Sequence, residues 1–175
     1  IHFREGNKMR IKGEVTTTSL QGPDSSSFLF VDAAKTKVRR LYAQNGKLLL
    51  QGQYDKVHPM GMGYFRVTRG NAVGVVTSEG KLVVPLTMDA VNAISNNAIS
   101  LLKDGRFGLF HCVTRKMMNP QFPANLVPYG KHFVMAKKNG LSGLLAWDGK
   151  PATGYEFEEI TYWNDTAAFV RRDGK

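Results

Sequence analysis

The chain has 175 residues, of which 42% are hydrophobic and 22% charged, a balance that excludes a disordered chain and suits one domain or several small repeats sharing a core. Its single cysteine, Cys112, excludes an intrachain disulfide and a thiolate metal cage. The formal net charge of +10 favours contact with nucleic acid, acidic glycans or anionic lipid, although it also keeps a protein soluble.

The first residues contain no targeting or membrane segment. The chain starts at Ile1 without an initiating Met or an apolar run, so it does not begin with a signal peptide. No apolar stretch approaches the roughly 20 residues that a membrane span requires. Because the chain also begins and ends abruptly, we expect a piece of a longer protein whose targeting segment, if it has one, has been removed. Residues 1–27 are predicted to be an atypical segment that caps the repeats that follow.

Four tight turns recur along the rest of the chain with an almost constant period. The turn dipeptides are Gly70-Asn71, Asp104-Gly105, Asn139-Gly140 and Asp173-Gly174, and their first residues are 34, 35 and 34 residues apart. Asp-Gly and Asn-Gly tolerate the positive φ angles of a type I′ turn, so they are the strongest short-range signal of a β-hairpin. Their regular spacing predicts a tandem repeat.

The residues around these turns also recur. Before each turn, alternate residues are apolar, which predicts half-buried strands. These residues are Phe65 and Val67, Ile99 and Leu101, Val134 and Ala136, and Ala168 and Val170. After the turn a glycine recurs inside the next strand, at Gly74, Gly108 and Gly143. A glycine in a strand predicts close backbone approach or a bulge.

A second turn, a short run and a link complete each unit. The second turn contains Gly80 or Gly149 followed by a lysine, and Gly46 marks a more degenerate copy one period earlier. The short run holds Pro85 in one copy, which predicts a sheet edge or the start of a loop. The link begins with Tyr54-Asp55-Lys56-Val57 and its counterparts in later copies.

The sequence therefore predicts an all-β fold of tandem β-hairpin repeats of 34–35 residues, with helix only at residues 87–95 if anywhere. The units fall at about 28–61, 62–95, 96–130, 131–164 and a partial 165–175. A unit of two or three strands cannot bury enough apolar surface alone, so neighbours should stack. We expect an open, twisted stack, because a propeller blade has four strands and typically about 40–45 residues; a closed, propeller-like ring is the alternative.

This pattern resembles the WG-repeat family of bacterial proteins. The resemblance rests on a strand, a basic residue, Asp-Gly or Asn-Gly, and a glycine that leads into an aliphatic strand, as in residues 101–110. It covers roughly residues 28–175, but the family's tryptophan before this glycine is Val73, Phe107 or Ser142 here. The resemblance implies an extracytoplasmic (periplasmic or cell-surface) or cell-associated scaffold, and it brings no catalytic motif.

Two columns of basic residues run through the repeats. The first column precedes the first turn and consists of Lys35, Arg69, Lys103, Lys138 and Arg172. The second column follows the second turn and consists of Lys47, Lys81, Arg115 and Lys150. In a regular stack each column would form a stripe along which a polyanion could bind. The same residues are also typical of exposed turns, where they protect strands from edge-to-edge pairing.

Aromatic residues and catalytic groups give weaker signals. Tyr129, Tyr162 and Trp163 lie in less regular links and are the candidate exposed aromatics. No histidine pair has a local metal-ligand spacing. His111 and Cys112 are adjacent on a predicted strand, so their side chains should point to opposite faces and not form a nucleophile–base pair. The sequence indicates no catalytic residue, cofactor, metal or small-molecule substrate.

We therefore expect a non-catalytic scaffold that presents an extended surface to a protein or cell-surface partner. One alternative is binding of a polyanion, an acidic glycan or nucleic acid, along the basic columns. Another is an accessory domain of a larger enzyme. Polyanion binding requires both columns to lie on one face, whereas a scaffold requires a continuous exposed apolar or aromatic patch.

Overall fold

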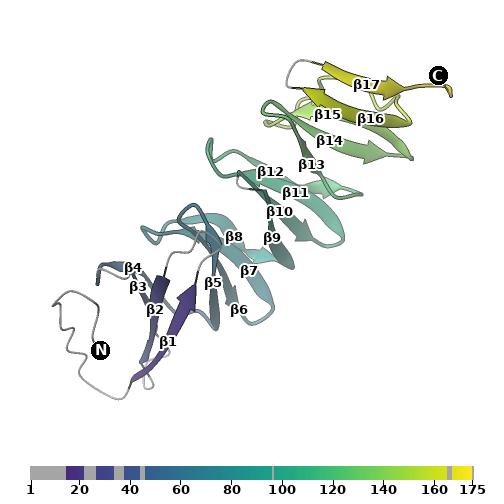
Figure 1. The fold of residues 1–175 in the computed structure, drawn as a ribbon. Helices are drawn as coiled ribbons and strands as arrows, with labels where there is room; N and C mark the ends of the chain where they lie inside the picture. Colours follow the sequence, from purple (N-terminus) through teal and green to yellow (C-terminus); the bar gives the residue numbers. More distant parts are fainter. Residues whose placement is uncertain are drawn as a thin grey trace. The chain divides into compact units, whose positions relative to one another are not determined.

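The structure is a computed structural model that describes residues 15–21, 27–33, 38–43, 46–95, 97–164 and 167–174. In these ranges every regular element is a β-strand (Figure 1), and no helix long and apolar enough to cross a bilayer occurs in them. The strands are β1 (Val15–Gln21), β2 (Ser27–Ala33), β3 (Val38–Ala43), β4 (Leu48–Gly52), β5 (Lys56–Gly61), β6 (Tyr64–Arg69), β7 (Ala72–Thr77), β8 (Leu82–Met88), β9 (Ala90–Ser95), β10 (Ala98–Lys103), β11 (Arg106–His111), β12 (Met117–Phe122), β13 (Val127–Tyr129), β14 (Phe133–Lys138), β15 (Leu141–Ala146), β16 (Glu159–Asn164) and β17 (Ala167–Arg171).

The strands form small antiparallel sheets in which neighbours in sequence are neighbours in the sheet. Three sheets have four strands, β1–β4, β5–β8 and β9–β12, and they are followed by the sheets β13–β15 and β16–β17. Each is an open up-and-down meander, and among the described strands none closes into a barrel. The predicted all-β architecture of tandem hairpins is confirmed.

The four-stranded sheets have more strands than the two or three that we predicted for one unit. The link that ends a predicted unit is the first strand of the next sheet, as when β5 pairs with β6. Segment 87–95, the one place where helix was expected, is instead the end of β8 and strand β9, which pairs with β10. These segments are extended because they complete their backbone hydrogen bonds with a neighbouring strand. Strand pairing therefore determines their conformation more than local propensity does.

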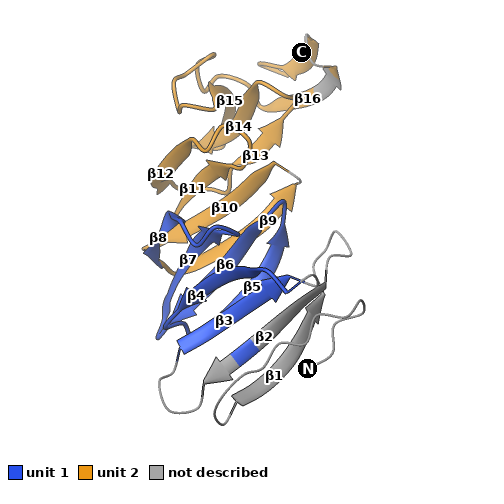
Figure 2. Cartoon of the chain, turned by 90° about the vertical axis from the view of Figure 1, so that its left-hand side faces the viewer, with its two compact units in different colours: residues 1–87 blue, residues 88–175 orange. Residues whose placement is uncertain are grey.

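The chain divides into two compact units, Ile1–Thr87 and Met88–Lys175 (Figure 2). A buried cluster in the first unit combines residues of two sheets: Leu41, Leu50, Val57, Phe65, Val67 and Val76. A cluster in the second unit does the same: Ala98, Leu109, Met118, Leu126, Val134, Ala136, Leu145 and Trp147. Within each unit, adjacent sheets therefore stack and share a core, as expected for repeats that cannot bury enough apolar surface alone.

The first turns have the backbone geometry that their dipeptides predict. Asp104 and Gly105 have φ angles of 50° and 70°, and the residues that flank them pair across the hairpin. Asn139-Gly140 and Asp173-Gly174 also have two positive φ angles, which is the type I′ pattern. Gly70 has a φ of 57° and supplies the positive angle in its own turn.

The second turns explain why one repeat is longer than the others. Three copies close with the same pair of backbone hydrogen bonds: residues 43–47, 77–81 and 146–150. In the remaining copy the His111 amide donates to the Lys116 carbonyl at 2.8 Å, so this loop contains one additional residue. Arg115, with a φ of 55°, adopts the left-handed conformation that glycine has in the other copies. The insertion accounts for the single 35-residue spacing.

The glycine that recurs after the first turn lies against the backbone of the last strand or the segment that replaces it. A Cβ atom added to Gly74 would lie 2.9 Å from the carbonyl oxygen of Val84, and one added to Gly143 would lie 2.7 Å from that of Gly154. Gly108 is equally confined, and the register between β11 and β12 shifts beside it. The predicted close backbone approach is confirmed, and it is the physical reason for the glycine column.

Candidate functional site

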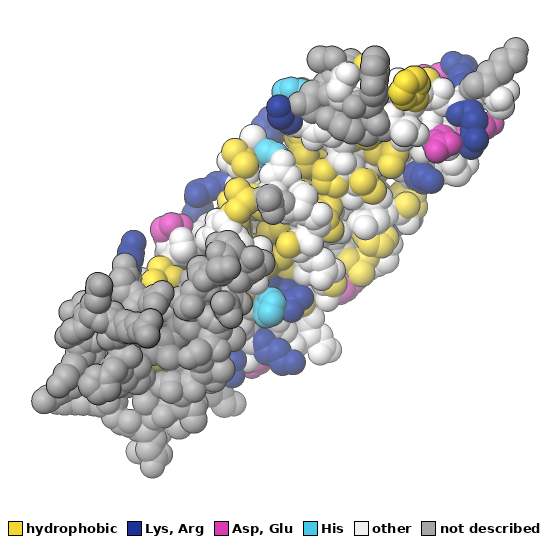
Figure 3. All heavy atoms as spheres, in the orientation of Figure 1, with side chains coloured by type: hydrophobic (Ala, Val, Ile, Leu, Met, Phe, Trp, Pro, Cys, Tyr) yellow, Lys and Arg dark blue, Asp and Glu magenta, His cyan; other side chains and the backbone are white. Residues whose placement is uncertain are grey.

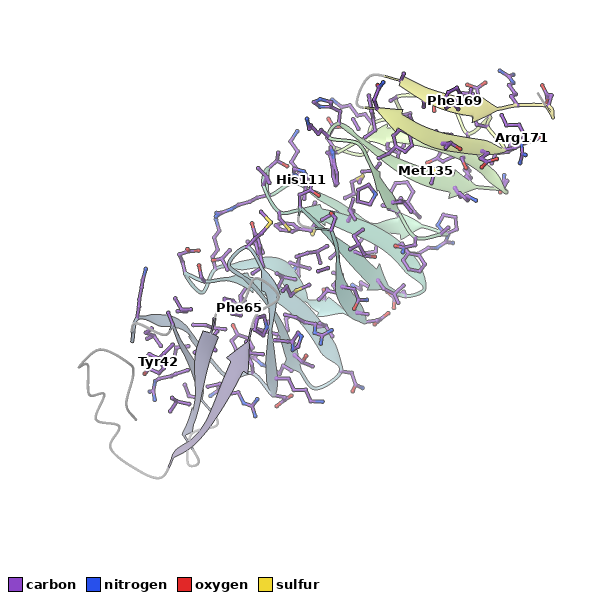
Figure 4. All side chains as sticks on the ribbon, in the orientation of Figure 1. Tyr42, Phe65, His111, Met135, Phe169 and Arg171 are labelled. Carbon is purple, nitrogen blue, oxygen red and sulfur yellow. The ribbon has the colours of Figure 1, made fainter. Side chains whose placement is uncertain are left out.

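Each sheet has two ends at which its strands are joined. Because consecutive strands are antiparallel, the first turns and the links lie at one end, here called the link end. The second turns lie at the opposite end, here called the loop end. In Figure 4, His111 marks the loop end and Arg171 the link end of the unit Met88–Lys175.

The two basic columns lie at opposite ends of the sheets. The first column is at the link end: Arg69, Lys103, Lys138 and Arg172. The second column is at the loop end: Lys47, Lys81, Arg115 and Lys150. Lys35 lies outside the described residues. The two columns therefore do not form one surface within a sheet, which is the arrangement that polyanion binding along both of them required.

Two arginines of the first column are held by neighbouring groups. Nε of Arg69 donates a hydrogen bond to the carbonyl of Gln53 at 2.9 Å, and the guanidinium lies 5.9 Å from the ring centre of Tyr54. Arg172 forms an ion pair of 2.8 Å with Glu156. These contacts join each arginine to a link, so the first column is in part a structural feature of the link end.

The charged residues of the unit Met88–Lys175 are distributed unevenly between its two ends. Among described residues, the link end has six acids and six bases: Asp89, Asp104, Glu156, Glu158, Glu159 and Asp173, and Lys103, Arg106, Lys137, Lys138, Arg171 and Arg172. The described loop end has four bases and one acid: Arg115, Lys116, Lys131, Lys150 and Asp148. The link end is thus balanced, whereas the loop end is net positive. Figure 3 shows dark blue and cyan side chains along the upper left margin of this unit, and magenta ones near its C-terminal hairpin.

Three loops meet at the loop end of this unit. They are residues 111–116, 130–132 and 147–150, together called the loop cluster. The ring centres of His111 and Trp147, which come from two different sheets, are 4.2 Å apart. Nε1 of Trp147 donates a hydrogen bond to the carbonyl oxygen of Lys131 at 3.0 Å. Trp147 therefore connects all three loops and fixes their positions relative to one another.

His111 is an uncharged part of the loop cluster. Its Nδ1 accepts a hydrogen bond from the Thr114 amide at 3.1 Å and lies 2.7 Å from the Thr114 hydroxyl. Because an amide can only donate, Nδ1 is the unprotonated nitrogen of a neutral ring. Burial lowers the pKa of His111 below its ordinary value, which keeps the ring neutral near pH 7.

Cys112, which follows His111, is buried in the loop cluster. Burial raises the pKa of the Cys112 thiol to about 11, so the thiol is protonated at neutral pH. A protonated, buried thiol is a poor nucleophile. In the part of the chain that the structure describes, no group of three or more His, Cys, Asp or Glu side chains is arranged to hold a metal ion.

The outer surface of the loop cluster combines positive charge with an apolar tip. Val113 is 66% exposed, and Arg115 and Lys116 beside it are also exposed. Asp148 accepts a hydrogen bond from the Lys150 amide at 3.1 Å, which is the main reason that its pKa is lowered. The charges of Lys150 and of Lys116, which belongs to the other sheet, act in the same direction. The two loops lie close together, since a Cβ atom added to Gly149 would lie 3.5 Å from Cγ of Met118.

The candidate exposed aromatics are placed differently from our expectation. Tyr129 is only 8% exposed, so its predicted exposure was wrong. It ends strand β13, pairs with Phe133 and points into the protein, where burial raises its pKa. Tyr162 and Trp163 lie in β16, and their side chains are outside the described part of the structure.

Sequence reasoning missed the loop cluster as a site. His111 and Trp147 are 36 positions apart and contact each other only because two sheets stack, so no local spacing links them. One signal was available. Both residues lie at the start of a second turn, in adjacent columns of the repeat, and the second turns of neighbouring repeats come together when the units stack.

Comparison with known proteins gives little further information. No protein-family model matches the chain, and no curated protein matches it. One similar solved structure is described as KlHsv2 with loop 6CD replaced by a Gly-Ser linker, with a TM-score of 0.36 and 11% sequence identity. The match covers 79% of this chain and 51% of that chain, so this chain spans about half the length of that protein. A likeness at this level carries no argument about function.

Proposed function

We propose that this chain is a non-catalytic repeat scaffold that binds a protein or cell-surface partner through the loop end of its sheets. The observation that carries the proposal is the loop cluster, in which the His111–Trp147 contact and the Trp147 hydrogen bond hold three loops together. Loops positioned by a rigid scaffold are where binding residues are most often found. Because the loops are already ordered, binding a partner costs little conformational entropy at this site.

Exposed apolar side chains on two edge strands, outside the loop cluster, support the choice of a polypeptide as the partner. Ile94 on β9 is 37% exposed, and Val127 on β13, the first strand of the next sheet, is 45% exposed. Figure 3 shows hydrophobic side chains, in yellow, gathered on the surface of this unit. Apolar residues on an edge strand favour contact with another polypeptide, because such an edge also offers unpaired backbone groups.

Membership of the WG-repeat family is part of the proposal. It is supported by the tight turns and by the glycine column, whose Gly74 and Gly143 leave no room for a side chain. With this membership comes the proposal that the protein is bacterial and acts outside the cytoplasm. Substitution of the family's tryptophan by Val73, Phe107 and Ser142 would then be a local departure that the stacked sheets tolerate.

Site-specific photo-cross-linking in cells that produce the protein tests the proposed function. A photoreactive phenylalanine analogue replaces Val113 in the loop cluster in one variant, and exposed Lys138 at the link end in a matched control. We expect illumination to produce an adduct of one defined mass from position 113 and not from position 138, with the partner identified by mass spectrometry. Equal adducts from both positions, or none from position 113, would contradict binding through the loop end.

A further inference from the structure

We propose that the partner's contact segment is an acidic stretch of polypeptide with aliphatic side chains, and that it binds at the loop cluster of the unit Met88–Lys175. This inference rests on the proposed function and specifies the chemistry of the partner. It is carried by three properties of the loop cluster: its charge, its exposed apolar tip and the burial of its aromatic rings.

Charge is the first property. Arg115, Lys116, Lys131 and Lys150 all lie in the loop cluster and are exposed, whereas Asp148 is its one described acid. Nζ of Lys150 lies 3.4 Å from Asp148, so that carboxylate offsets one of the four positive charges. A net positive surface of this kind attracts carboxylates over several ångströms and increases the rate of encounter with an acidic segment.

An exposed apolar tip is the second property. Val113 stands between the buried Cys112 and the basic residues of the same loop, and 66% of its surface is exposed. Met117, the first residue after the loop, is 36% exposed. An aliphatic side chain beside lysines and arginines favours a ligand that alternates carboxylates with apolar groups. An acidic protein segment has both kinds of group.

The buried aromatic rings argue against a single-stranded nucleic acid. Proteins that bind single strands stack bases on exposed aromatic side chains beside a positive groove. Near the loop cluster, Trp147 is 9% exposed and Tyr129 8% exposed, and the Trp147 ring faces His111. These rings have no free face of the size that a base requires. The imidazole of His132 is the exposed ring of the described loop cluster, and it is smaller than the platforms that stack successive bases. The positive charges therefore favour a partner that needs no row of stacking rings.

Fluorescence anisotropy with defined ligands tests the inference. The ligand is a fluorescein-labelled peptide of repeated Glu-Glu-Leu, and the comparison ligands are the same peptide with Gln for Glu, a heparin fragment and a single-stranded oligothymidine. For Lys116→Glu/Lys131→Glu we expect affinity for the acidic peptide to fall at least about tenfold, because each substitution reverses a charge at the site. The matched control Lys103→Glu/Lys138→Glu reverses two charges at the link end and should change the affinity less than about twofold.

A second variant separates the apolar contribution from the charge. Val113→Ser leaves every charge in place. It is expected to lower the affinity for the acidic peptide severalfold and to leave the affinity for the heparin fragment unchanged. Tighter binding of heparin or oligothymidine than of the peptide would overturn the inference in favour of a polyanion. An equal loss of peptide affinity in the two charge-reversal variants would overturn it too, because the peptide would then not bind specifically at the loop cluster. A cross-linked partner at position 113 together with no saturable peptide binding would leave the proposed function standing and remove this inference alone.

Discussion

Oδ2 of Asp89 accepts a hydrogen bond from the backbone amide of Asp104 at 2.7 Å, so the residue that starts a sheet holds the first turn of that sheet in place. Asp55 makes the same bond to the Gly70 amide at 2.6 Å one repeat earlier. In each pair the two residues are 15 positions apart, and β5 or β9 joins the hairpin that follows it through this contact. The acidic residue of the link therefore has a structural role.

Replacing Asp89 tests this role. Asp89→Ala removes the acceptor and is expected to lower the free energy of unfolding by about 1 kcal/mol, the usual net value of one hydrogen bond. Asp89→Asn keeps a side-chain oxygen at the same place and should retain most of the stability. Chemical denaturation followed by circular dichroism measures both variants; equal stability of Asp89→Ala and the native protein would show that the bond contributes nothing.

The glycine column predicts a steric effect. Gly108→Ala would direct a methyl group into the backbone of β12, beside Met118 and Pro120, and should lower the free energy of unfolding by about 2 kcal/mol. Gly154→Ala is the matched control, because the atom nearest to a Cβ there would be Oε1 of Glu156, at an ordinary contact distance of 3.6 Å. Thermal unfolding of the two proteins should therefore give clearly different midpoints; similar midpoints would mean that β12 moves aside at little cost.

Ser142 gives the opposite prediction. Its side chain is 1% exposed, and no described hydrogen-bond partner reaches its hydroxyl. Ser142→Ala removes a buried polar atom and is expected to raise the stability by about 1 kcal/mol. Ser100→Ala is the control, since the Ser100 hydroxyl donates to Asn125 at 3.0 Å and its loss should be destabilising. A destabilised Ser142→Ala protein would reveal a partner for the hydroxyl.

His111 makes the stability of its unit depend on pH. Its pKa in the folded chain is lowered from 6.5, so below that pH the unfolded chain binds the proton more readily than the folded chain does. Stability should be constant above about pH 7 and fall between about pH 6.5 and the lower folded value. The thermal midpoint of His111→Gln should depend less on pH than that of the native protein. A native midpoint that stays constant on acidification to about pH 5 would contradict this assignment.

Cys112 provides a direct measure of burial in the loop cluster. Because its thiol pKa is raised to about 11, the folded protein should react with iodoacetamide near pH 7.5 on the order of a hundredfold more slowly than the denatured chain. Mass spectrometry of quenched samples gives both rates. Comparable rates in the folded and denatured states would mean that the 112–116 loop opens frequently.

The hairpins could be predicted from the sequence because their turns have a strong local requirement. Asp104-Gly105 and Asn139-Gly140 adopt two positive φ angles, which few other dipeptides tolerate, so their spacing revealed the repeat. The first strand of each sheet was harder to recognise. Segment 87–95 becomes extended by pairing with β10, and the sequence of the segment alone does not predict this pairing. Local propensity is a weak guide where pairing supplies the hydrogen bonds.

The candidate site could be predicted only in part. Lys150 was found as a member of a repeat column, since its position depends on the turn alone. Arg115 was assigned to the same column, but because of the additional residue it takes the position of the turn glycine, and Lys116 takes the column position. The contact between His111 and Trp147, and the burial of Tyr129, depend on how one sheet packs on the next. A periodic pattern does not predict such packing. It predicts the strands and turns of each unit, but not which side chains contact each other between units.

The additional residue in the loop that His111 and Lys116 close has an evolutionary consequence. Strand β12 and the glycine of the next repeat resume their usual places after it, so a change of length here is absorbed without repacking the core. Insertions at the link end would instead displace the first strand of the following sheet. Copies of the repeat can therefore differ in length at the loop end, one loop at a time, while the strands of the stacked sheets keep their places.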